Sequence, residues 1–554
     1  MKARGHLLLL ALACRCVDEV PTAPTAAPLA WSCPPSWVAF AQGGCGPAAL
    51  LCAPGGGAAA RACEGLDVTH PLVARDTHGD AVHGFWRADD GAIRGGWRAP
   101  GDDGGAPAVD WSPPEPEGVP DTRWSPDAPR GSCPPGWTGT VAQGCRPSLR
   151  SDCPLDAALP NGTCLPLGDA DCPSGTWATV AGVDAPLLRV RAGADPASAD
   201  GSESRPFASL AGAFAAAPVD AWVLIAAGEY ELPPSLPAGV TLMGVCAARV
   251  TLRAVGVDAS VNATRSVALR NVTLRSDGRG LSVPRGATAT LQRVRLAGAA
   301  GVGVEAASGA RVALDGVLIE QVRATDTFAR GLWAQGAEVT GGGLLVRAVE
   351  GVGVDIDGAG ATASVAVVTV RDLGGGSAPG FGVEVHGGAT ATLSRALLHG
   401  TGAVGVTVHD PRSSLTLQDA RVEAIGGARD GVAAQVTDGA SLQSQRVSYA
   451  DSRGVLLLVA GNGTRATCED CALASVTRVS AAPQGTALRV QGGAHLDGQR
   501  LRVTGAATAA LTVVGSGSEA AVTDLDVRGA QGESAVGVAS GASLRLQRVL
   551  VAEG

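Results

Sequence analysis

The sequence predicts an all-β protein: a right-handed parallel β-helix of about a dozen coils, preceded by a small, loop-rich, disulfide-rich region. Three observations support this fold class. An eleven-residue motif returns at intervals of about 25 residues over the second half of the chain. Aromatic residues make up only 3% of the 554 residues, whereas Gly accounts for 78 of them. Nine of the 14 cysteines fall between Cys33 and Cys172.

The start of the chain has the features of an export signal. In residues 1–13, Lys2 and Arg4 precede a short apolar stretch. The run Ala11-Leu12-Ala13-Cys14 resembles a bacterial lipobox, which predicts lipidation of Cys14 and leaves ordinary signal cleavage as the alternative. Residues 14–32 are rich in Pro, Ala and Thr and are expected to form a tether. No later stretch reaches transmembrane length, so we expect membrane contact only through a lipid anchor.

Residues 33–180 contain a duplicated cysteine module with a linker between the copies. Cys33-Pro-Pro-Ser-Trp37 and Cys133-Pro-Pro-Gly-Trp137 are each followed by a second cysteine 12 residues after the first. Such Pro- and Gly-rich segments bury little apolar surface and depend on disulfides in an oxidising compartment. Zinc is disfavoured because the close C-x₂-C spacing is missing, and the connectivity itself stays open. The spacing favours local pairs and leaves Cys172 over; these pairs are Cys33–Cys45, Cys52–Cys63, Cys133–Cys145 and Cys153–Cys164.

The β-helix is predicted over residues 185–554, and it begins with one helix. Residues 207–217 combine helical spacing with good helix formers and end at Pro218, which predicts an α-helix. Apolar residues then predict strands over 222–230 and 240–244.

The repeated motif is the strongest signal in the chain. It reads Gly-Ala-Thr-Ala-Thr-Leu-Gln-Arg-Val-Arg-Leu at residues 286–296, and a second apolar strand follows in each repeat. A unit of this length without a helix cannot bury its apolar side alone, whereas stacked units share one continuous core. The alternation predicts that residues at the apolar positions of the repeat point inward, among them Leu291, Val304, Leu314, Val354, Val383, Val406 and Val538.

The entry to the repeats carries a family resemblance. The runs Asp200-Gly-Ser-Glu-Ser-Arg-Pro206, Ile225-Ala-Ala-Gly-Glu-Tyr230 and Val240-Thr-Leu-Met-Gly244 resemble the entry of right-handed β-helices of the pectin-lyase-like superfamily. The Cys-Pro-Gly-Trp modules are similar to those of surface lipoproteins from GC-rich Gram-negative bacteria. The resemblance implies a β-helix in an extracytoplasmic location, as an outer-membrane lipoprotein or a secreted cell-surface protein. It implies no established activity.

Composition and motifs narrow the function. The formal charge of −9 excludes a nucleic-acid binder that works through a basic surface. Of the motifs found in polygalacturonase-like enzymes, only His386-Gly387 matches, and we find no Ser/His/Asp motif or phosphate loop. We therefore predict a non-catalytic surface protein whose β-helix is a scaffold for binding or adhesion, with a polysaccharide or another surface protein as partner. The alternative is a carbohydrate-active enzyme of the same superfamily, a polysaccharide lyase or hydrolase.

One group of outward strand positions is the candidate binding site. Aligning neighbouring repeats places Trp333, Asp355 and Glu384 in one column, and Asp357, His386 and His409 in the next. Carboxylates beside imidazoles are ligands for a divalent metal, the one cofactor that this site could hold, and an exposed Trp ring can stack on a sugar. The simpler interpretation is that these positions are polar because they face water.

Cys468-Glu-Asp-Cys471 is a second cysteine signal, inside the repeats. The two cysteines replace Leu291 and Val294 of the motif, both inward positions. This replacement favours core packing or a tight local disulfide, whereas a redox motif would need a strand–helix context that is missing here.

Overall fold

The computed structural model describes residues 131–552 except for 181, 255–258, 262–265, 326–327, 375–378, 427–430, 478–484 and 532–534. Before residue 131 it assigns backbone strands only, β1 (Trp37–Ala39), β2 (Cys45–Pro47), β3 (Thr77–His78), β4 (Ala81–Arg87), β5 (Ile93–Arg98) and β6 (Val109–Trp111). The predicted signal, the Cys14 lipidation and the pairs Cys33–Cys45 and Cys52–Cys63 lie outside the described residues. By its contacts, the chain divides into two compact units, residues 1–87 with 95–106 and residues 88–94 with 107–554.

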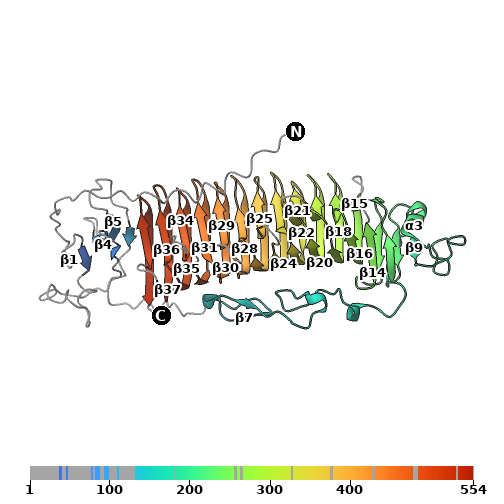
Figure 1. Cartoon of the computed structure of the whole chain (residues 1–554), viewed down its shortest axis with the longest axis horizontal. Coiled ribbons are helices and arrows are strands. Elements are labelled where there is room, and N and C mark those ends of the chain that lie inside the picture. Colours follow the sequence, from blue (N-terminus) through green and yellow to red (C-terminus); the bar gives the residue numbers. More distant parts are fainter. Residues whose placement is uncertain are drawn as a thin grey trace. The chain divides into compact units, whose positions relative to one another are not determined.

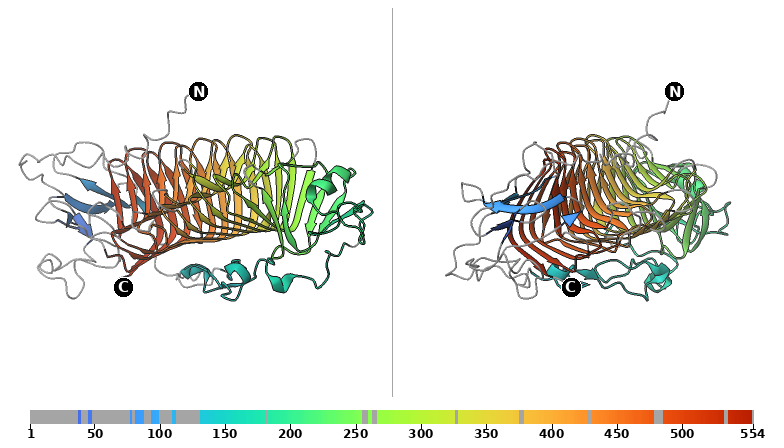
Figure 2. Two further views of the ribbon diagram at one scale, coloured as in Figure 1. Left: turned by 45° about the vertical axis from the view of Figure 1, so that its right-hand side comes forward. Right: turned by 60° about the vertical axis from the view of Figure 1, so that its left-hand side comes forward.

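The second unit is built around a parallel β-helix, which confirms the predicted all-β fold class. Its strands stack side by side, one coil after another (Figures 1 and 2). One side of every coil contributes to a 13-stranded parallel sheet. In order, its strands are β12 (Ser235–Leu236), β15 (Ala259–Val261), β17 (Leu281–Val283), β19 (Val302–Ala306), β21 (Ala329–Gln335), β23 (Gly351–Asp357), β25 (Phe381–His386), β27 (Val404–Val408), β29 (Gly431–Thr437), β31 (Gly454–Ala460), β34 (Thr486–Gln491), β36 (Ala509–Val514) and β38 (Val536–Ala539).

The remaining sides of the coils are formed by longer strands that pair in parallel with the next coil. These strands are β9 (Leu187–Val190), β10 (Trp222–Ile225), β11 (Gly228–Glu231), β13 (Thr241–Gly244), β14 (Val250–Ala254), β16 (Ser266–Ser276), β18 (Thr288–Ala297), β20 (Arg311–Val322), β22 (Glu338–Val349), β24 (Thr362–Leu373), β26 (Thr390–Thr401), β28 (Ser414–Glu423), β30 (Ser441–Ala450), β32 (Arg465–Glu469), β33 (Ala472–Val476), β35 (His495–Ala506), β37 (Glu519–Arg528) and β39 (Ser543–Ala552).

The core consists of the inward residues of these strands. All seven residues that the repeat predicted to point inward are buried, from Leu291 with no exposed surface to Val538 at 7%. The predicted helix is α3 (Leu210–Ala216). Ser209 caps its N-terminus, and the Ser209 hydroxyl accepts a hydrogen bond from the Gly212 N–H. The single strand predicted over 222–230 is instead two strands, β10 and β11, and the second begins at Gly228 with φ of +153°.

The long strands bend at residues with a positive φ, which were not predicted from the sequence. Most coils have two such residues, five positions apart, and we call the first of each two the corner residue. The corner residue has a positive φ, near +50° to +70°. From β26 onwards the corner residues alternate in charge, and we call them the corner ladder: Arg395, Asp419, Arg446, Asp470, Arg500, Asp524 and Arg548. Arg446 donates two hydrogen bonds to Asp419, at 2.5 and 2.7 Å, and Arg500 donates two to Asp470, at 2.6 and 2.9 Å.

The residue six positions before each corner residue lies in a turn, and it alternates between serine or threonine in one coil and alanine in the next. Ser413, Thr464 and Ser518 belong to the coils with an Asp corner, and each hydroxyl accepts a hydrogen bond from a glycine N–H of the preceding coil. The coils with an Arg corner have alanine at this position: Ala389, Ala440, Ala494 and Ala542. The structural repeat in this part of the helix is therefore a pair of coils.

Residues 131–180 form a segment with little regular structure along the long strands, drawn in blue-green in Figure 1. Its elements are β7 (Trp137–Thr138), η2 (Val141–Gln143), β8 (Arg146–Pro147), η3 (Pro154–Asp156) and η4 (Asp169–Asp171). Disulfides join Cys133 to Cys145 and Cys153 to Cys164, which are two of the local pairs that the spacing favoured. Cys172, left over by the spacing, pairs with Cys246 of the β-helix, 74 residues later.

This segment packs on an outward side of the β-helix. Leu159, Leu165 and Leu167 form a buried apolar cluster with outward residues of the long strands, among them Leu318 and Leu345. These apolar side chains would otherwise face water, so the segment is part of the folded unit.

Within the repeats, Cys468 and Cys471 form a disulfide next to the Asp470 corner, and both cysteines are buried. In the described part of the chain, no helix is long and apolar enough to span a membrane.

Candidate functional site

The candidate site lies on the 13-stranded sheet, where neighbouring coils bring its residues together. The strand register pairs Trp333 of β21 with Asp355 of β23, and Asp355 with Glu384 of β25. It also pairs Asp357 with His386. His409 follows β27 and belongs to the next coil. We call Asp355, Asp357, Glu384, His386 and His409 the histidine cluster.

Each imidazole of the cluster lies between two carboxylates. His386 Nε2 is 3.1 Å from Asp355 Oδ1, and its Nδ1 is 3.4 Å from Asp357 Oδ1. His409 repeats the arrangement one coil further along, with Nε2 3.1 Å from Glu384 Oε1 and Nδ1 3.4 Å from Asp410 Oδ2. Both rings are thereby fixed in orientation.

Asp355 is the buried centre of this group. Its side chain was predicted to point outward, but it has no exposed surface because neighbouring side chains contact both oxygens. Arg330 donates from Nε to Oδ2 at 2.6 Å, while His386 contacts Oδ1. The Arg330 guanidinium also lies 4.5 Å from the ring centre of Trp333. Arg330 therefore links the aromatic ring to the carboxylates.

The carboxylates raise the pKa of both histidines. Burial alone would lower the pKa of His386, but the hydrogen bond that it donates to Asp355 and the charges of Asp355, Asp357 and Glu384 outweigh this effect and raise the pKa to about 9. For His409, burial is likewise outweighed by the bond and charge of Glu384, and its pKa is raised. Burial raises the pKa of Asp357 above its ordinary value.

Three side chains of the cluster could hold a metal ion. Asp355, Glu384 and His386 each offer a ligand atom, and these atoms lie within 4.8 Å of one another. A metal ion would have to compete with Arg330 for Asp355 and with the proton on His386, whose pKa is raised to about 9. A second group, Asp152 with Cys153 and Cys164, fails because both sulfurs are in a disulfide.

Beyond the cluster, the same outward column continues over four more coils. From Glu384 the register runs through Thr407, Gln435, Leu458 and Arg489. Gln435 donates a hydrogen bond to Thr407 at 3.3 Å. We call the column from Trp333 to Arg489 the Trp333 column.

Sequence reasoning missed Arg330, Asp410 and Arg489. The available signal for Arg330 was a departure from the repeat, because its register partners in later coils are Val352, Phe381 and Val404. A charged residue at a position that is apolar in the neighbouring coils indicates a specific ion-pair partner, which for Arg330 is Asp355.

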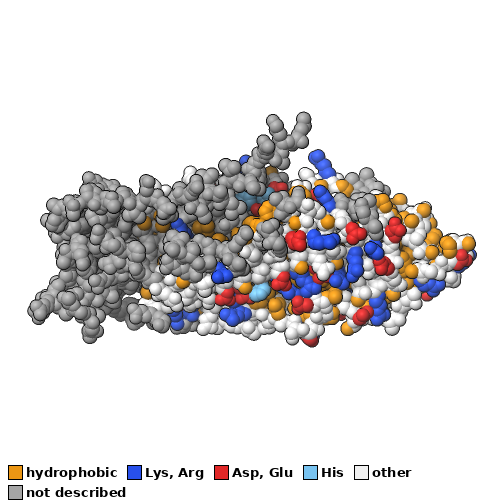
Figure 3. Space-filling model, viewed as in Figure 1, with side chains coloured by type: hydrophobic (Ala, Val, Ile, Leu, Met, Phe, Trp, Pro, Cys, Tyr) orange, Lys and Arg blue, Asp and Glu red, His pale blue; other side chains and the backbone are white. Residues whose placement is uncertain are grey.

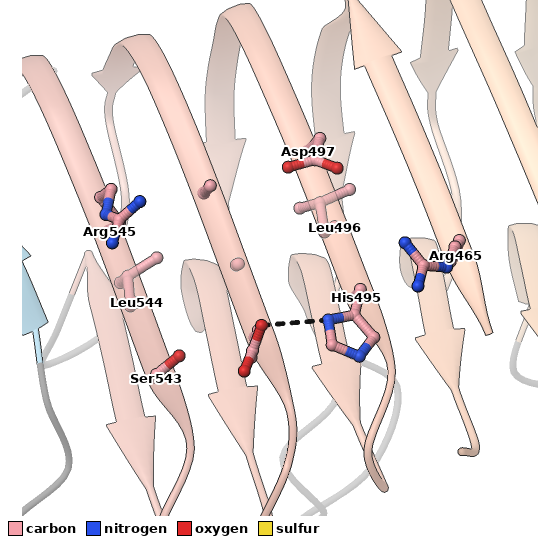
Figure 4. A pocket seen from close by; sticks show the side chains of 10 residues that line it. Arg465, His495, Leu496, Asp497, Ser543, Leu544 and Arg545 are labelled. Atoms are coloured by element: carbon pink, nitrogen blue, oxygen red, sulfur yellow. Dashed lines mark hydrogen bonds and ion pairs between the residues drawn. The ribbon is translucent and has the colours of Figure 1, made fainter. Parts of the chain in front are cut away.

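A second hollow, of about 460 Å³, lies on the long strands near the last coils (Figure 4). His495 forms an ion pair there with Glu519, at 3.1 Å between Nδ1 and Oε2. Arg465, Asp497 and Arg545 also line it, so charges of both signs are mixed. Mixed charge is also seen over the face in Figure 3, where Arg and acidic side chains lie side by side. Among the described residues that line this hollow there is no Trp, Tyr or Phe, whereas the Trp333 column has an aromatic ring.

No protein-family model and no curated protein sequence match this chain. Among solved structures, it is similar to the pectate lyase Pel9A, with 13% identity, a TM-score of 0.37, and coverage of 52% of this chain and 79% of that one. It is similar to the A-module of the mannuronan C-5 epimerase AlgE6 of Azotobacter vinelandii, with 14% identity, a TM-score of 0.33, and coverage of 58% and 90%. It is also similar to the Agl-KA catalytic domain, with 12% identity, a TM-score of 0.33, and coverage of 67% and 70%. The strand pairing described above, rather than these similarities, defines the fold.

Proposed function

We propose that this protein is a non-catalytic, extracytoplasmic binding protein whose Trp333 column binds a carbohydrate. One observation carries the proposal: the ring of Trp333 and the carboxylates of Asp355 and Glu384 lie in register on one face. Contacts with Arg330 and His386 hold this group rigid. The disulfides of the described residues support the location, because such bonds persist in oxidising compartments.

The chemistry of the column suits a sugar. Sugar hydroxyls both donate and accept hydrogen bonds, and the apolar side of a sugar ring packs on an aromatic ring. Glu384, Asp357 and His409 keep 22%, 30% and 27% of their side-chain surface exposed, so they are accessible while still being fixed. Rigid polar groups lose little entropy when a ligand binds.

The protonation of the cluster supports a binding role over catalysis. A general base must be unprotonated at the working pH and must reach the substrate. His386, with a pKa of about 9, is protonated at neutral pH, and Asp355 is buried with both oxygens engaged.

One observation favours the enzymatic alternative. The raised pKa of Asp357, beside the carboxylate of Glu384, has the character of a general acid next to a second carboxylate. Hydrolysis of a glycosidic bond uses such a pair of carboxyl groups.

A glycan array probed with the full-length protein tests the proposal. We expect binding of at least one polysaccharide class, a loss of at least ten-fold in affinity for Trp333→Ala, and no change for Trp222→Ala. Trp222 is a matched control because Arg270 stacks on it at 5.0 Å on another side of the helix. A protein that binds no glycan contradicts the proposal. Bound glycan is then incubated and analysed by mass spectrometry, and cleavage that Asp357→Asn abolishes would favour the enzyme.

The surface anchoring predicted from the sequence has its own test. Palmitate labelling of the wild type, lost in Cys14→Ser, would support a lipoprotein, whereas an unlabelled secreted protein would favour ordinary signal cleavage. Binding to another surface protein is the second partner class that the sequence suggested. It would be favoured by a glycan-independent interaction that Trp333→Ala still abolishes.

A further inference from the structure

We propose that Arg489 and Gln491 form an anion-binding subsite at the far end of the Trp333 column, which receives a carboxylate or sulfate group of the ligand. The inference rests on the proposed carbohydrate binding for the identity of the ligand. The subsite itself rests on the surroundings of Arg489.

Arg489 lies on β34 in register with Leu458 of the preceding coil and Thr512 of the following one. Both register neighbours are uncharged. The Arg489 Nε donates a hydrogen bond to Gln491 Oε1 at 2.8 Å, which fixes the plane of the guanidinium. Because Nε makes this bond, the two terminal nitrogens of the guanidinium remain available as a pair of hydrogen-bond donors.

Arg489 has no acidic partner among the described residues, unlike several other half-buried or buried arginines of the helix. Arg330 pairs with Asp355, Arg446 with Asp419, and Arg502 with Asp526. Over the described residues, no carboxylate oxygen lies within 4.0 Å of the Arg489 guanidinium, the limit for an ion pair. Burial consequently lowers the pKa of Arg489, and no neighbouring charge offsets that effect.

A half-buried guanidinium without a counter-ion favours an anion from outside. Arginine presents paired donors that match the two oxygens of a carboxylate or sulfate group. The Gln491 side-chain amide can donate one more hydrogen bond to the same group.

The distance along the column defines the size of the ligand. Arg489 lies four coils from Glu384, which corresponds to about 19 Å at ~4.8 Å per coil. A ligand that reaches both must therefore be an extended oligosaccharide. The carboxylates of the histidine cluster are already paired with Arg330 and the histidines, whereas Arg489 attracts an anionic group, so the acidic groups of the ligand would be favoured at the Arg489 end of the column.

The first test uses inorganic sulfate and the full-length protein. At matched ionic strength, sodium sulfate should raise the melting temperature of the wild type above its value in sodium chloride. Sulfate also stabilises folded proteins in general, so this rise should be smaller in Arg489→Gln and unchanged in Arg395→Gln, a half-buried arginine at a corner on another side. A rise of equal size in Arg489→Gln overturns the subsite. Because the charge has no partner to lose, Arg489→Gln without sulfate should melt no lower than the wild type. A clear drop would instead indicate a structural role.

The second test compares oligogalacturonate with a neutral oligogalactan of equal length. We expect Arg489→Gln to lose at least ten-fold in affinity for the acidic ligand only, and Arg489→Lys to recover part of it. If Trp333-dependent binding is found but Arg489→Gln alters neither affinity, the subsite is wrong and the proposed function stands. If no glycan of the array binds while the sulfate effect depends on Arg489, the subsite stands and the proposed function fails.

Discussion

His386 stacks on His409, with ring centres 4.9 Å apart and ring planes 10° apart, although the pKa of each imidazole is raised. A positive charge on one of these rings disfavours a positive charge on the other at this distance. They are held together because each lies between two carboxylates, so the cluster contains alternating rather than accumulated charge. The stack therefore depends on pH.

The first prediction concerns this dependence. The folded pKa of His386, about 9, lies above its ordinary value of 6.5, so its contribution to stability is complete below pH 6.5 and is lost as the pH rises through 9. The loss is at most about 3 kcal/mol. The melting temperature of the wild type should fall between pH 6.5 and 9.5, and the fall should be smaller in His386→Gln. Parallel curves for the two proteins would contradict this assignment.

The second prediction is that Arg330→Met destabilises the helix by about 1–3 kcal/mol, because it removes one of the two cationic partners, Arg330 and His386, of the buried Asp355 carboxylate. Urea denaturation measures the loss. The double variant Arg330→Met with Asp355→Asn also removes the negative charge of the Asp355 carboxylate and should regain much of the stability. A double variant no more stable than Arg330→Met would show that the pair is not coupled.

The third prediction concerns the disulfide between Cys172 and Cys246. It closes a separation of 74 residues, and chain entropy assigns about 4 kcal/mol to a loop of that size. Replacing both cysteines by Ser should lower the melting temperature and expose residues 131–180 to protease. The matched control replaces Cys468 and Cys471, which close a separation of only three residues, and should cost less. Equal losses would argue against the entropic account.

The fourth prediction concerns the corner ladder. Asp470→Asn removes the carboxylate that accepts two hydrogen bonds from Arg500 and should cost about 1–3 kcal/mol. Asp372→Asn is the control, because its ion pair with Arg371 is exposed and should contribute little. Raising the salt concentration should reduce the difference in melting temperature between the wild type and Asp470→Asn. A difference that is unaffected by salt would show that the ladder does not act through charge.

The sequence was sufficient to predict the coil and its inward residues, because the alternation of residues such as Leu291 and Leu314 is a local pattern. It was also sufficient to bring Asp357 and His386 into adjacent coils, since parallel strands in register align equivalent positions. It could not show that Asp355 is buried, because that burial arises from Arg330 and His386 on two other coils. The partner of Cys172 was hidden for a similar reason, since it lies in another structural region.

The corner ladder also constrains how this protein can evolve in length. Loss of the single coil that carries Asp470 would bring Arg446 against Arg500, so that like charges meet at half-buried corners. Loss of that coil together with a neighbour would again place an acid beside a base, and a serine or threonine turn beside an alanine turn. Insertions and deletions in this part of the chain should therefore be tolerated in even numbers of coils. Duplication by pairs would lengthen the helix without disturbing its charge pattern.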